Sequence, residues 1–134
     1  MNSCLIDTQI AFWIVQDSPK LKTKTRDILR IMSDGVFFSQ VSLFELSIKQ
    51  KIGKLPEFNT NIEQIYTQLL ENGLQFLPIQ NNHIWAYEQI PLVDAHRDPF
   101  DRLILATALA EKLPVISSDD KFQYYDSIIE IIKN

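Results

Sequence analysis

The chain has 134 residues, of which 46% are hydrophobic and 22% are charged. This composition is close to the average of folded domains and excludes a disordered or fibrous protein. The formal net charge of -4 argues against broad, non-specific affinity for nucleic acid, because such affinity depends on phosphate neutralisation by lysine and arginine. We expect a single domain that spans residues 1–134.

Short apolar runs alternate along the chain with longer stretches of helical spacing. The runs lack polar alternation and are typical of strands that are buried on both faces. In chain order, the predicted strands are residues 4–6, 36–38, 76–77, 115–116, and 128–129 with 131–132. The first predicted helix begins at residue 8, and the others cover residues 23–32, 42–52, 62–71, 83–90 and 99–112. This order predicts a three-layer α/β/α sandwich with a central parallel sheet of about five strands, similar to a Rossmann fold.

Glycine marks the ends of several predicted helices. Gly35, Gly53 and Gly73 each follow a stretch of helical spacing. Glycine is the residue that most often adopts the left-handed conformation at the end of a helix. We therefore expect all three to be C-caps.

The cysteine count and the N-terminal segment bear on the compartment. Cys4 is the only cysteine, so no disulfide can form within the chain. The apolar run at residues 10–15 is too short for a signal-peptide core or a membrane span. We expect a cytoplasmic protein without a membrane partner.

Several acidic residues lie at the start of predicted helices, where each has a structural explanation. Asp98 precedes Pro99 and has the pattern of an N-cap, with Asp101 in the first turn. Glu45 lies three residues after Ser42, which is the spacing of a capping box. Helix capping therefore accounts for each of these side chains when it is considered alone.

Four of the acids, considered together, predict a cluster. Asp7, Asp101 and Asp119 lie just past predicted strands, and Glu45 lies one turn beyond another. The carboxyl ends of parallel strands lie along one edge of the sheet, where such folds bind their ligands. Clustered carboxylates raise one another's pKa values unless a cation joins them. Oxygen ligands without a histidine or cysteine cluster favour Mg²⁺ or Mn²⁺ over zinc.

Four blocks of the sequence resemble the PIN-domain nucleases in their order and spacing. The blocks are CLIDT at 4–8, SLFEL at 42–46 with Lys49 and GKL at 53–55, HRDPFDR at 96–102, and PVISSD at 114–119 with Phe122 and Tyr125. The HRDPFDR block is the most specific of the four. More narrowly, the chain resembles the VapC-type toxins of bacterial toxin-antitoxin pairs.

The resemblance implies an endoribonuclease that uses one or two Mg²⁺ or Mn²⁺ ions to hydrolyse phosphodiester bonds in RNA of the tRNA or rRNA class. The catalytic and metal-binding residues it implies are Asp7, Glu45, Asp101 and Asp119. It also implies that Thr8 and Ser117 are polar groups supporting the acids. A small antitoxin that covers the site, and a homodimer, are the implied partners.

Three positions depart from the usual pattern of the family. Gln9 stands where many relatives carry histidine, Phe44 where many carry tryptophan, and Ser117 where threonine is usual. None of these departures removes a carboxylate. Asp120 directly follows Asp119, and the spacing to the later aromatic residues favours Asp119 as the fourth acid.

Basic residues and histidines have both structural and functional interpretations. Lys49 and Arg102 are candidate contacts to RNA phosphates, with solvated or ion-paired roles as the alternative. The basic stretches at residues 20–30 and 49–54 form either solvated helix faces or a rim that faces RNA. For His83 and His96 we expect surface or capping roles, not catalysis.

Two other classes of function remain open from the sequence. A phosphoacceptor receiver domain shares the layered architecture, but it requires an adjacent acid pair after the first strand and a lysine after a late strand. A catalytically silent PIN module that acts by binding is harder to separate. The intact set of acids argues against it.

Overall fold

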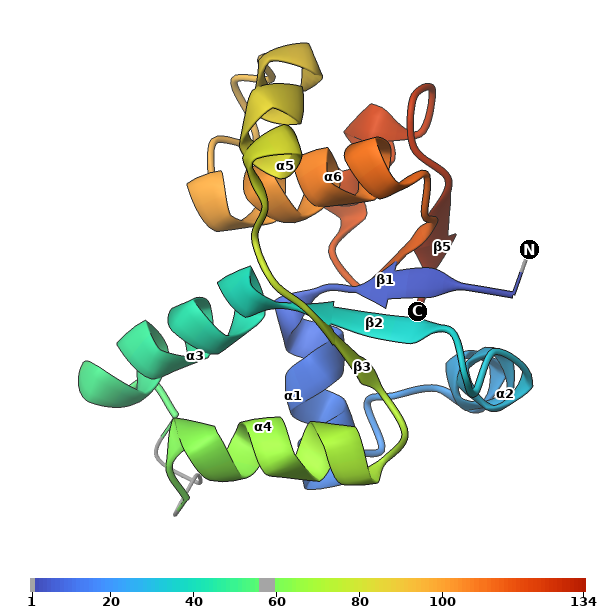
Figure 1. Cartoon of the computed structure of the whole chain (residues 1–134), viewed down its shortest axis with the longest axis vertical. Helices are drawn as coiled ribbons and strands as arrows, with labels where there is room; N and C mark the ends of the chain where they lie inside the picture. Colours follow the sequence, from blue (N-terminus) through green and yellow to red (C-terminus); the bar gives the residue numbers. More distant parts are fainter. Residues whose placement is uncertain (1, 56–59) are drawn as a thin grey trace.

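The computed structural model describes residues 2–55 and 60–134, and it contains one sheet of five strands (Figure 1). All neighbouring strands are parallel, in the order β3-β2-β1-β4-β5. The strands are β1 (Cys4–Ile6), β2 (Val36–Ser39), β3 (Gln75–Leu77), β4 (Val115–Ser117) and β5 (Ile131–Lys133). The predicted parallel sheet is confirmed. Residues 128–129 are not part of a strand; they form a turn in which both amides approach the carbonyl of Tyr125.

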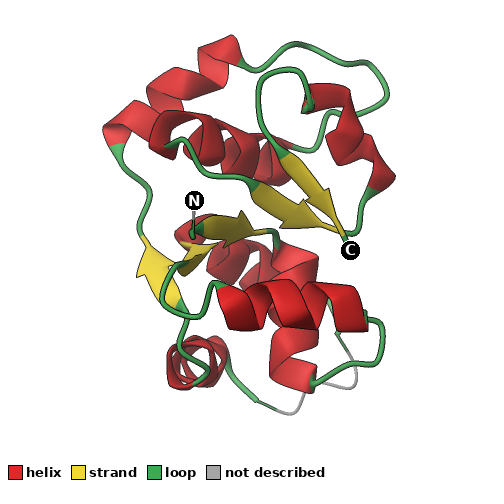
Figure 2. Cartoon of the chain, turned by 90° about the vertical axis from the view of Figure 1, so that its right-hand side faces the viewer, coloured by secondary structure: helices red, strands yellow, loops and turns green. Residues whose placement is uncertain are grey.

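Helices cover both faces of the sheet. They are α1 (Thr8–Gln16), α2 (Thr23–Ile31), α3 (Gln40–Lys51), α4 (Ile62–Glu71), α5 (Asn81–Ala86) and α6 (Pro99–Glu111), with the 3-10 helices η1 (Tyr87–Gln89) and η2 (Asp120–Tyr125). Figure 1 shows α5 and α6 on one side of the sheet and α1 and α4 on the other, and Figure 2 shows the strands between the two layers. The predicted three-layer sandwich is confirmed. No helix among the described residues is long and apolar enough to cross a membrane.

Successive residues of each strand pack into different cores, which explains the unbroken apolar runs. On β1, Cys4 and Ile6 belong to the core shared with α1 and α4, whereas Leu5 belongs to the core shared with α6. On β2, Phe38 and Phe37 divide in the same way. A strand that is buried on both faces has no position for a polar side chain until it ends. The first polar residue after β1 is therefore held at the edge of the sheet.

The strand order changes direction at β1, because the chain first adds strands on one side of β1 and later on the other. Strands β2 and β3 lie on one side of β1, and β4 and β5 lie on the other. Leu5 and Ile6 pair with Val115 and Ile116, and the amide of Asp7 continues the ladder by donating to the carbonyl of Ile116 at 3.1 Å. Open α/β sheets bind ligands at such a switch point. The strand order also rules out a receiver domain, whose order is 2-1-3-4-5.

The three glycines have two different roles. Gly53 and Gly73 follow α3 and α4 with φ of 76° and 88°, so the predicted C-caps are confirmed there. Gly35 is not a C-cap, because α2 ends at Ile31 and Met32 is its C-cap. A Cβ at Gly35 would lie 2.1 Å from the carbonyl oxygen of Asn2. Glycine at this position allows the start of β1 to approach the chain that leads into β2.

A buried arginine ties α6 to the segment that follows η1. Arg102 is 3% exposed, and its guanidinium donates to the carbonyls of Ile90 and Pro91 at 3.0 and 2.9 Å. It also donates to the hydroxyls of Tyr87 and Tyr125, both at 3.1 Å, and lies over the Tyr87 ring. A guanidinium engaged in this way has no surface to offer a phosphate. The prediction of a phosphate contact for Arg102 is therefore corrected to a structural role.

Replacing Arg102 with lysine should destabilise the fold. Lysine keeps the charge but cannot reproduce the planar set of donors, so buried carbonyl and hydroxyl groups lose their partners. We expect Arg102→Lys to lower the free energy of unfolding in urea by about 2–4 kcal/mol. Arg97→Lys is the matched control, because its side chain is 78% exposed and its ion pair with Asp94 is at the surface. Equal stability of the two variants would contradict the structural role.

Candidate metal centre

A polar cavity of about 220 Å³ lies at the switch point of the sheet. Its lining residues are Asp7, Thr8, Gln9, Glu45, Lys49, Asp98, Asp101, Ser118 and Asp119. The four acids singled out in the sequence are all in this set. They come from four places in the fold: the end of β1, the middle of α3, the first turn of α6 and the turn after β4. Figure 1 shows how β1, α3 and α6 approach one another at this end of the sheet.

Asp7 lies deepest in the site. It is 4% exposed, and its carboxylate caps α1 by accepting from the amide of Ile10 at 2.9 Å. Burial raises the pKa of Asp7 to about 7, and the charges of Asp101 and Glu45 act in the same direction. Hydrogen bonds from the Ser117 side chain and the Ile10 amide offset part of this rise in pKa. The fold therefore holds Asp7 at a buried position where ionisation of its carboxylate is unfavourable.

Asp101 faces the same cavity from the first turn of α6. Burial raises its pKa to about 6, and the negative charges of Asp98 and Glu45 add to the rise. A hydrogen bond with His96 opposes it. Asp98 is the N-cap of α6, as predicted, and accepts from the amide of Phe100 at 2.8 Å. Because Asp98 satisfies the helix start, Asp101 is not needed as a cap.

The capping-box interpretation of Glu45 is wrong. Helix α3 begins at Gln40, and Ser39 is its N-cap, accepting from the amide of Val41 at 3.0 Å. Ser42 lies inside the helix, where its hydroxyl accepts from Thr8 at 3.0 Å. Glu45 is therefore in the second turn of α3 and has no capping role.

One oxygen of Glu45 is left without a partner. The side chain is buried, and Oε2 lies 3.2 Å from Nζ of Lys49. Oε1 has no hydrogen-bond partner among the described residues, although it is inaccessible to solvent. An unpaired buried carboxylate oxygen is costly, and native structures rarely contain one without a functional reason. This atom is the clearest sign that the cavity accommodates a positively charged ligand.

Asp119 and its neighbour Asp120 face different surroundings. Asp119 lines the cavity and caps η2 by accepting from the amide of Lys121 at 2.9 Å. Asp120 is exposed, forms an ion pair with Lys133, and is not a lining residue. The structure thus brings Asp119, and not Asp120, to the other three acids.

The predicted supporting residues lie beside the acids. Thr8 lines the cavity and connects α1 to α3 through its bond to Ser42. Ser117 is fully buried, contacts Asp7, and accepts from the amide of Asp119 at 3.0 Å. Lys49 is partly exposed and lines the cavity next to Glu45. The structure therefore leaves Lys49 as the predicted phosphate contact that is still accessible.

The expectation of surface roles for the two histidines is wrong, because both are buried. His83 does have a capping role, since its Nδ1 accepts from the amide of Gln80, and its Nε2 lies 2.8 Å from Glu111. His96 belongs to the site: its Nε2 lies 3.0 Å from Oδ2 of Asp101. His96, Asp101 and Asp119 also place potential ligand atoms within 4.8 Å of one another. The position of His96 within the HRDPFDR block was the signal that sequence reasoning overlooked.

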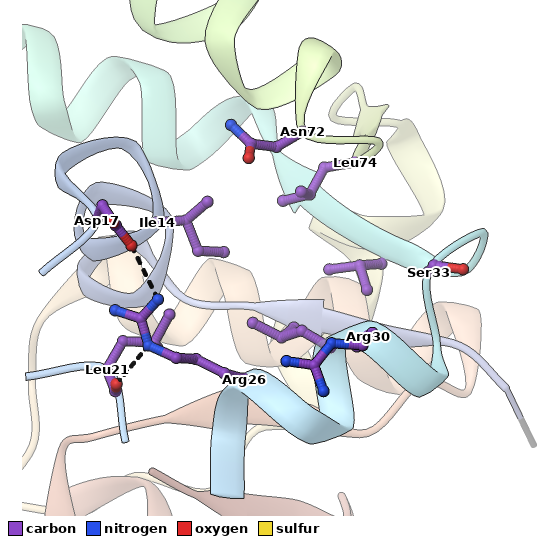
Figure 3. A pocket seen from close by; sticks show the side chains of 10 residues that line it. Ile14, Asp17, Leu21, Arg26, Arg30, Ser33, Asn72 and Leu74 are labelled. Carbon is purple, nitrogen blue, oxygen red and sulfur yellow. Dashed lines mark hydrogen bonds and ion pairs between the residues drawn. The ribbon is translucent and has the colours of Figure 1, made fainter. Parts of the chain in front are cut away.

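The basic stretch at residues 20–30 lies away from the acids. A second cavity of about 330 Å³ is lined partly by residues of α1 and α2, among them Arg26 and Arg30. Figure 3 shows the side chains that line it. Arg26 donates to Asp17 at 2.9 Å and to the carbonyl of Leu21, whereas Arg30 pairs with Asp27. None of these residues lines the acidic cavity. The stretch therefore does not form a rim around the candidate metal centre.

Removing the charge of Asp7 should stabilise the metal-free protein in a pH-dependent way. The folded-state pKa of about 7 lies above the unfolded value of 3.8, so the folded state loses stability as pH rises between these values. Asparagine retains the capping oxygen but cannot ionise. With EDTA present, we expect Asp7→Asn to raise the free energy of unfolding near pH 8 by about 2–4 kcal/mol, since one pKa unit corresponds to about 1.4 kcal/mol.

This gain should shrink as the pH falls toward about 4, and urea denaturation at several pH values measures it. The matched control is Asp34→Asn, at an exposed position outside the cavity. The control should show little change at any pH. A gain for Asp7→Asn that does not vary with pH would contradict the burial of a charged carboxylate.

The same fold occurs in known toxin-antitoxin structures. One such structure is VapBC2 from Rickettsia felis bound to a DNA fragment from its promoter. A chain of it superposes with a TM-score of 0.68 at 15% identity and 96% coverage of both chains. A chain of DNA-bound VapBC from Salmonella typhimurium gives 0.66 at 17% identity, covering 99% of this chain and 98% of that one. VapBC-5 from Mycobacterium tuberculosis gives 0.61 at 23% identity and 100% coverage of both.

The sequence matches a family model, although no individual curated protein matches it. The family model of the PIN domain matches residues 4–128, a span that contains all four acids of the cavity. The chain belongs to the PIN-domain family.

Proposed function

We propose that this PIN domain is a metal-dependent endoribonuclease and the toxin of a toxin-antitoxin pair. The observation that carries the proposal is the unpaired Oε1 of Glu45, buried at a cavity that Asp7, Asp101 and Asp119 also line. Family membership and the VapBC neighbours support the choice of a nuclease toxin over other metal-binding domains.

The donor set of the cavity fits a hard divalent cation. Among its described lining residues, Lys49 is the only one with a positive charge, against five acidic side chains. Burial and mutual repulsion raise the pKa values of Asp7 and Asp101, so a cation is the partner that the cluster lacks. Carboxylate oxygens suit Mg²⁺ and Mn²⁺. Asp7, Glu45, Asp101 and Asp119 would hold the ion.

The reaction proposed is hydrolysis of a phosphodiester bond. When bound, the cation lowers the pKa of a water molecule and stabilises the departing oxygen. The water adds to phosphorus and the 3′-oxygen leaves, so the products carry a 5′-phosphate and a 3′-hydroxyl. Ser117 orients Asp7 for this task, and Thr8 connects the helix starts that support the acids. Lys49, partly exposed beside Glu45, contacts a phosphate of the substrate.

The substrate class and the partners follow from the family resemblance. We propose structured RNA, such as tRNA or rRNA, as the substrate. Because the net charge is -4, the RNA must be recognised through local contacts near the cavity and not through a general basic surface. We also propose a small antitoxin that covers the acids, a homodimer and a cytoplasmic location. The VapBC structures among the neighbours support the antitoxin partner.

A catalytically silent PIN module that acts by binding is the second candidate. It would retain the fold but would not need four buried or partly buried acids at one cavity. The cost of holding Asp7 and Asp101 in charged form argues for a catalytic use.

The nuclease proposal can be tested with Glu45→Gln. Glutamine has nearly the same shape and Glu45 has no capping role, so the fold should survive while an anionic ligand is lost. We expect cleavage of total RNA in Mn²⁺ to fall by at least about 100-fold, more than is typical for a residue outside the ligand shell. Asp120→Asn is the matched control and should remain active, because Asp120 does not line the cavity.

EDTA should abolish cleavage by the wild type. Cleavage that persists in EDTA, or that survives both Glu45→Gln and Asp7→Asn, would rule out the metal mechanism. Metal binding without cleavage of any RNA would instead favour the silent module.

The toxin role can be tested in cells. We expect expression of the wild-type chain to stop bacterial growth, because the nuclease would act on essential RNA, and Asp101→Asn to relieve the arrest at equal protein level. Growth curves with immunoblotting measure both. Co-expression of the product of a short neighbouring reading frame should restore growth and copurify with the chain. Normal growth at high expression of an active nuclease would count against the toxin role.

A further inference from the structure

Three buried polar side chains form a line that ends at Asp101. Arg102 Nη1 lies 3.1 Å from the hydroxyl of Tyr125, and that hydroxyl lies 2.8 Å from Nδ1 of His96. Nε2 of His96 lies 3.0 Å from Oδ2 of Asp101. Arg102 and His96 are each 3% exposed and Tyr125 is fully buried, so water does not compete along the line.

The chemistry of the groups fixes the direction of these hydrogen bonds. A guanidinium only donates, so the oxygen of Tyr125 accepts from Arg102. The hydroxyl hydrogen of Tyr125 is then directed to Nδ1 of His96, which lies 2.8 Å away. A neutral imidazole that accepts at Nδ1 carries its hydrogen on Nε2. His96 therefore donates from Nε2 to Asp101.

The ring of His96 is also fixed by packing. It lies 5.5 Å from the ring of Tyr125 and 5.8 Å from the ring of Phe122, measured between centroids. Its backbone amide donates to the carbonyl of Val93 at 2.9 Å. A donor held from two sides has little freedom to leave Asp101. One oxygen of Asp101 is thus fixed, while Oδ1 has no bond to His96.

We propose that His96 is a positioning residue of the acidic centre, which uses Nε2–H to set the orientation of the Asp101 carboxylate so that Oδ1 faces the cation. The Tyr125 hydroxyl selects the required tautomer of His96, and Arg102 holds that hydroxyl. This inference rests on the proposed function, because it assigns His96 a task in metal binding. It also explains the histidine, the second aspartate and the final arginine of the HRDPFDR block, because one line of hydrogen bonds connects all three.

The alternative is that His96 is itself a ligand, because its ring nitrogen lies within 4.8 Å of ligand atoms of Asp101 and Asp119. Both ring nitrogens already have partners, which are Tyr125 and Asp101. Ligation through Nε2 would require His96 to give up its bond to Asp101. The geometry therefore favours positioning, and direct ligation becomes an outcome of the test.

The test measures Mn²⁺ affinity by calorimetry, in addition to RNA cleavage. We expect His96→Ala to weaken Mn²⁺ binding about 10- to 100-fold, which is typical for loss of a partner that orients a ligand. His96→Gln should recover most of this affinity, since its amide can donate to Asp101. Tyr125→Phe should give a smaller loss. His83→Gln is the matched control, because His83 is a buried histidine paired with Glu111 outside the cavity.

Nitrogen NMR of metal-free protein provides a readout that does not depend on activity. We expect His96 to carry hydrogen on Nε2 in the wild type and to populate the other tautomer in Tyr125→Phe. Wild-type Mn²⁺ affinity in His96→Ala, or hydrogen on Nδ1 in the wild type, would overturn the inference. Nitrogen coupling to bound Mn²⁺ in electron paramagnetic resonance would overturn it in favour of ligation.

Failure of the proposed function would look different. If the wild type binds Mn²⁺ but cleaves no RNA, the nuclease proposal fails and the affinity series still decides the role of His96. A wild type that binds no Mn²⁺ overturns both.

Discussion

The cost of burying several carboxylates at one cavity is the constraint on which the rest of this structure depends. Asp7 and Glu45 are almost fully buried, Asp101 and Asp119 face the same cavity, and Lys49 is the positive charge beside them. Burial is the largest cause of the raised pKa values of Asp7 and Asp101. A fold that is only marginally stable keeps such a cluster only if the surrounding structure holds each side chain in place. The local structure of the chain can be understood as a response to this cost.

Two of the acids offset part of this cost by capping helices. Asp7 caps α1 and Asp119 caps η2, so each carboxylate accepts from backbone amides that would otherwise lack a partner. The two apolar strands that precede them, β1 and β4, are neighbours in the sheet and bring the caps together. Asp98 takes the capping position of α6, which leaves Asp101 available for the cavity. A bound cation would then stabilise the folded state by mass action, because the unfolded chain does not assemble the cluster.

Much of this arrangement could be predicted from local sequence, and the exceptions share a physical cause. The apolar runs located all five strands, and the convergence of the acids followed from the geometry of a parallel sheet. Glu45 was misinterpreted because Ser39 and Ser42 both have the chemistry of an N-cap, and only the end of β2 decides between them. His96 was missed because its ring is held by Tyr125, which is distant in sequence, and its spacing to Asp101 within the HRDPFDR block does not by itself show that the two side chains meet. Contacts between remote segments depend on tertiary packing, which a pattern within one element does not contain.

Arg102 illustrates how adjacent residues on one helix can serve different regions of the fold. Successive residues of an α-helix point about 100° apart, so Asp101 faces the cavity while Arg102 faces the buried segment after η1. From the sequence, Arg102, next to the metal-binding candidate Asp101, is a candidate contact to an RNA phosphate. The structure instead connects them through Tyr125 and His96, along a path that leaves α6 and returns to it. Because α6 carries both ends of this path, a rotation of the helix that moved the carboxylate would also break the contacts of the arginine. The packing of Arg102 in the core thereby restricts the orientation of an acid that it does not touch.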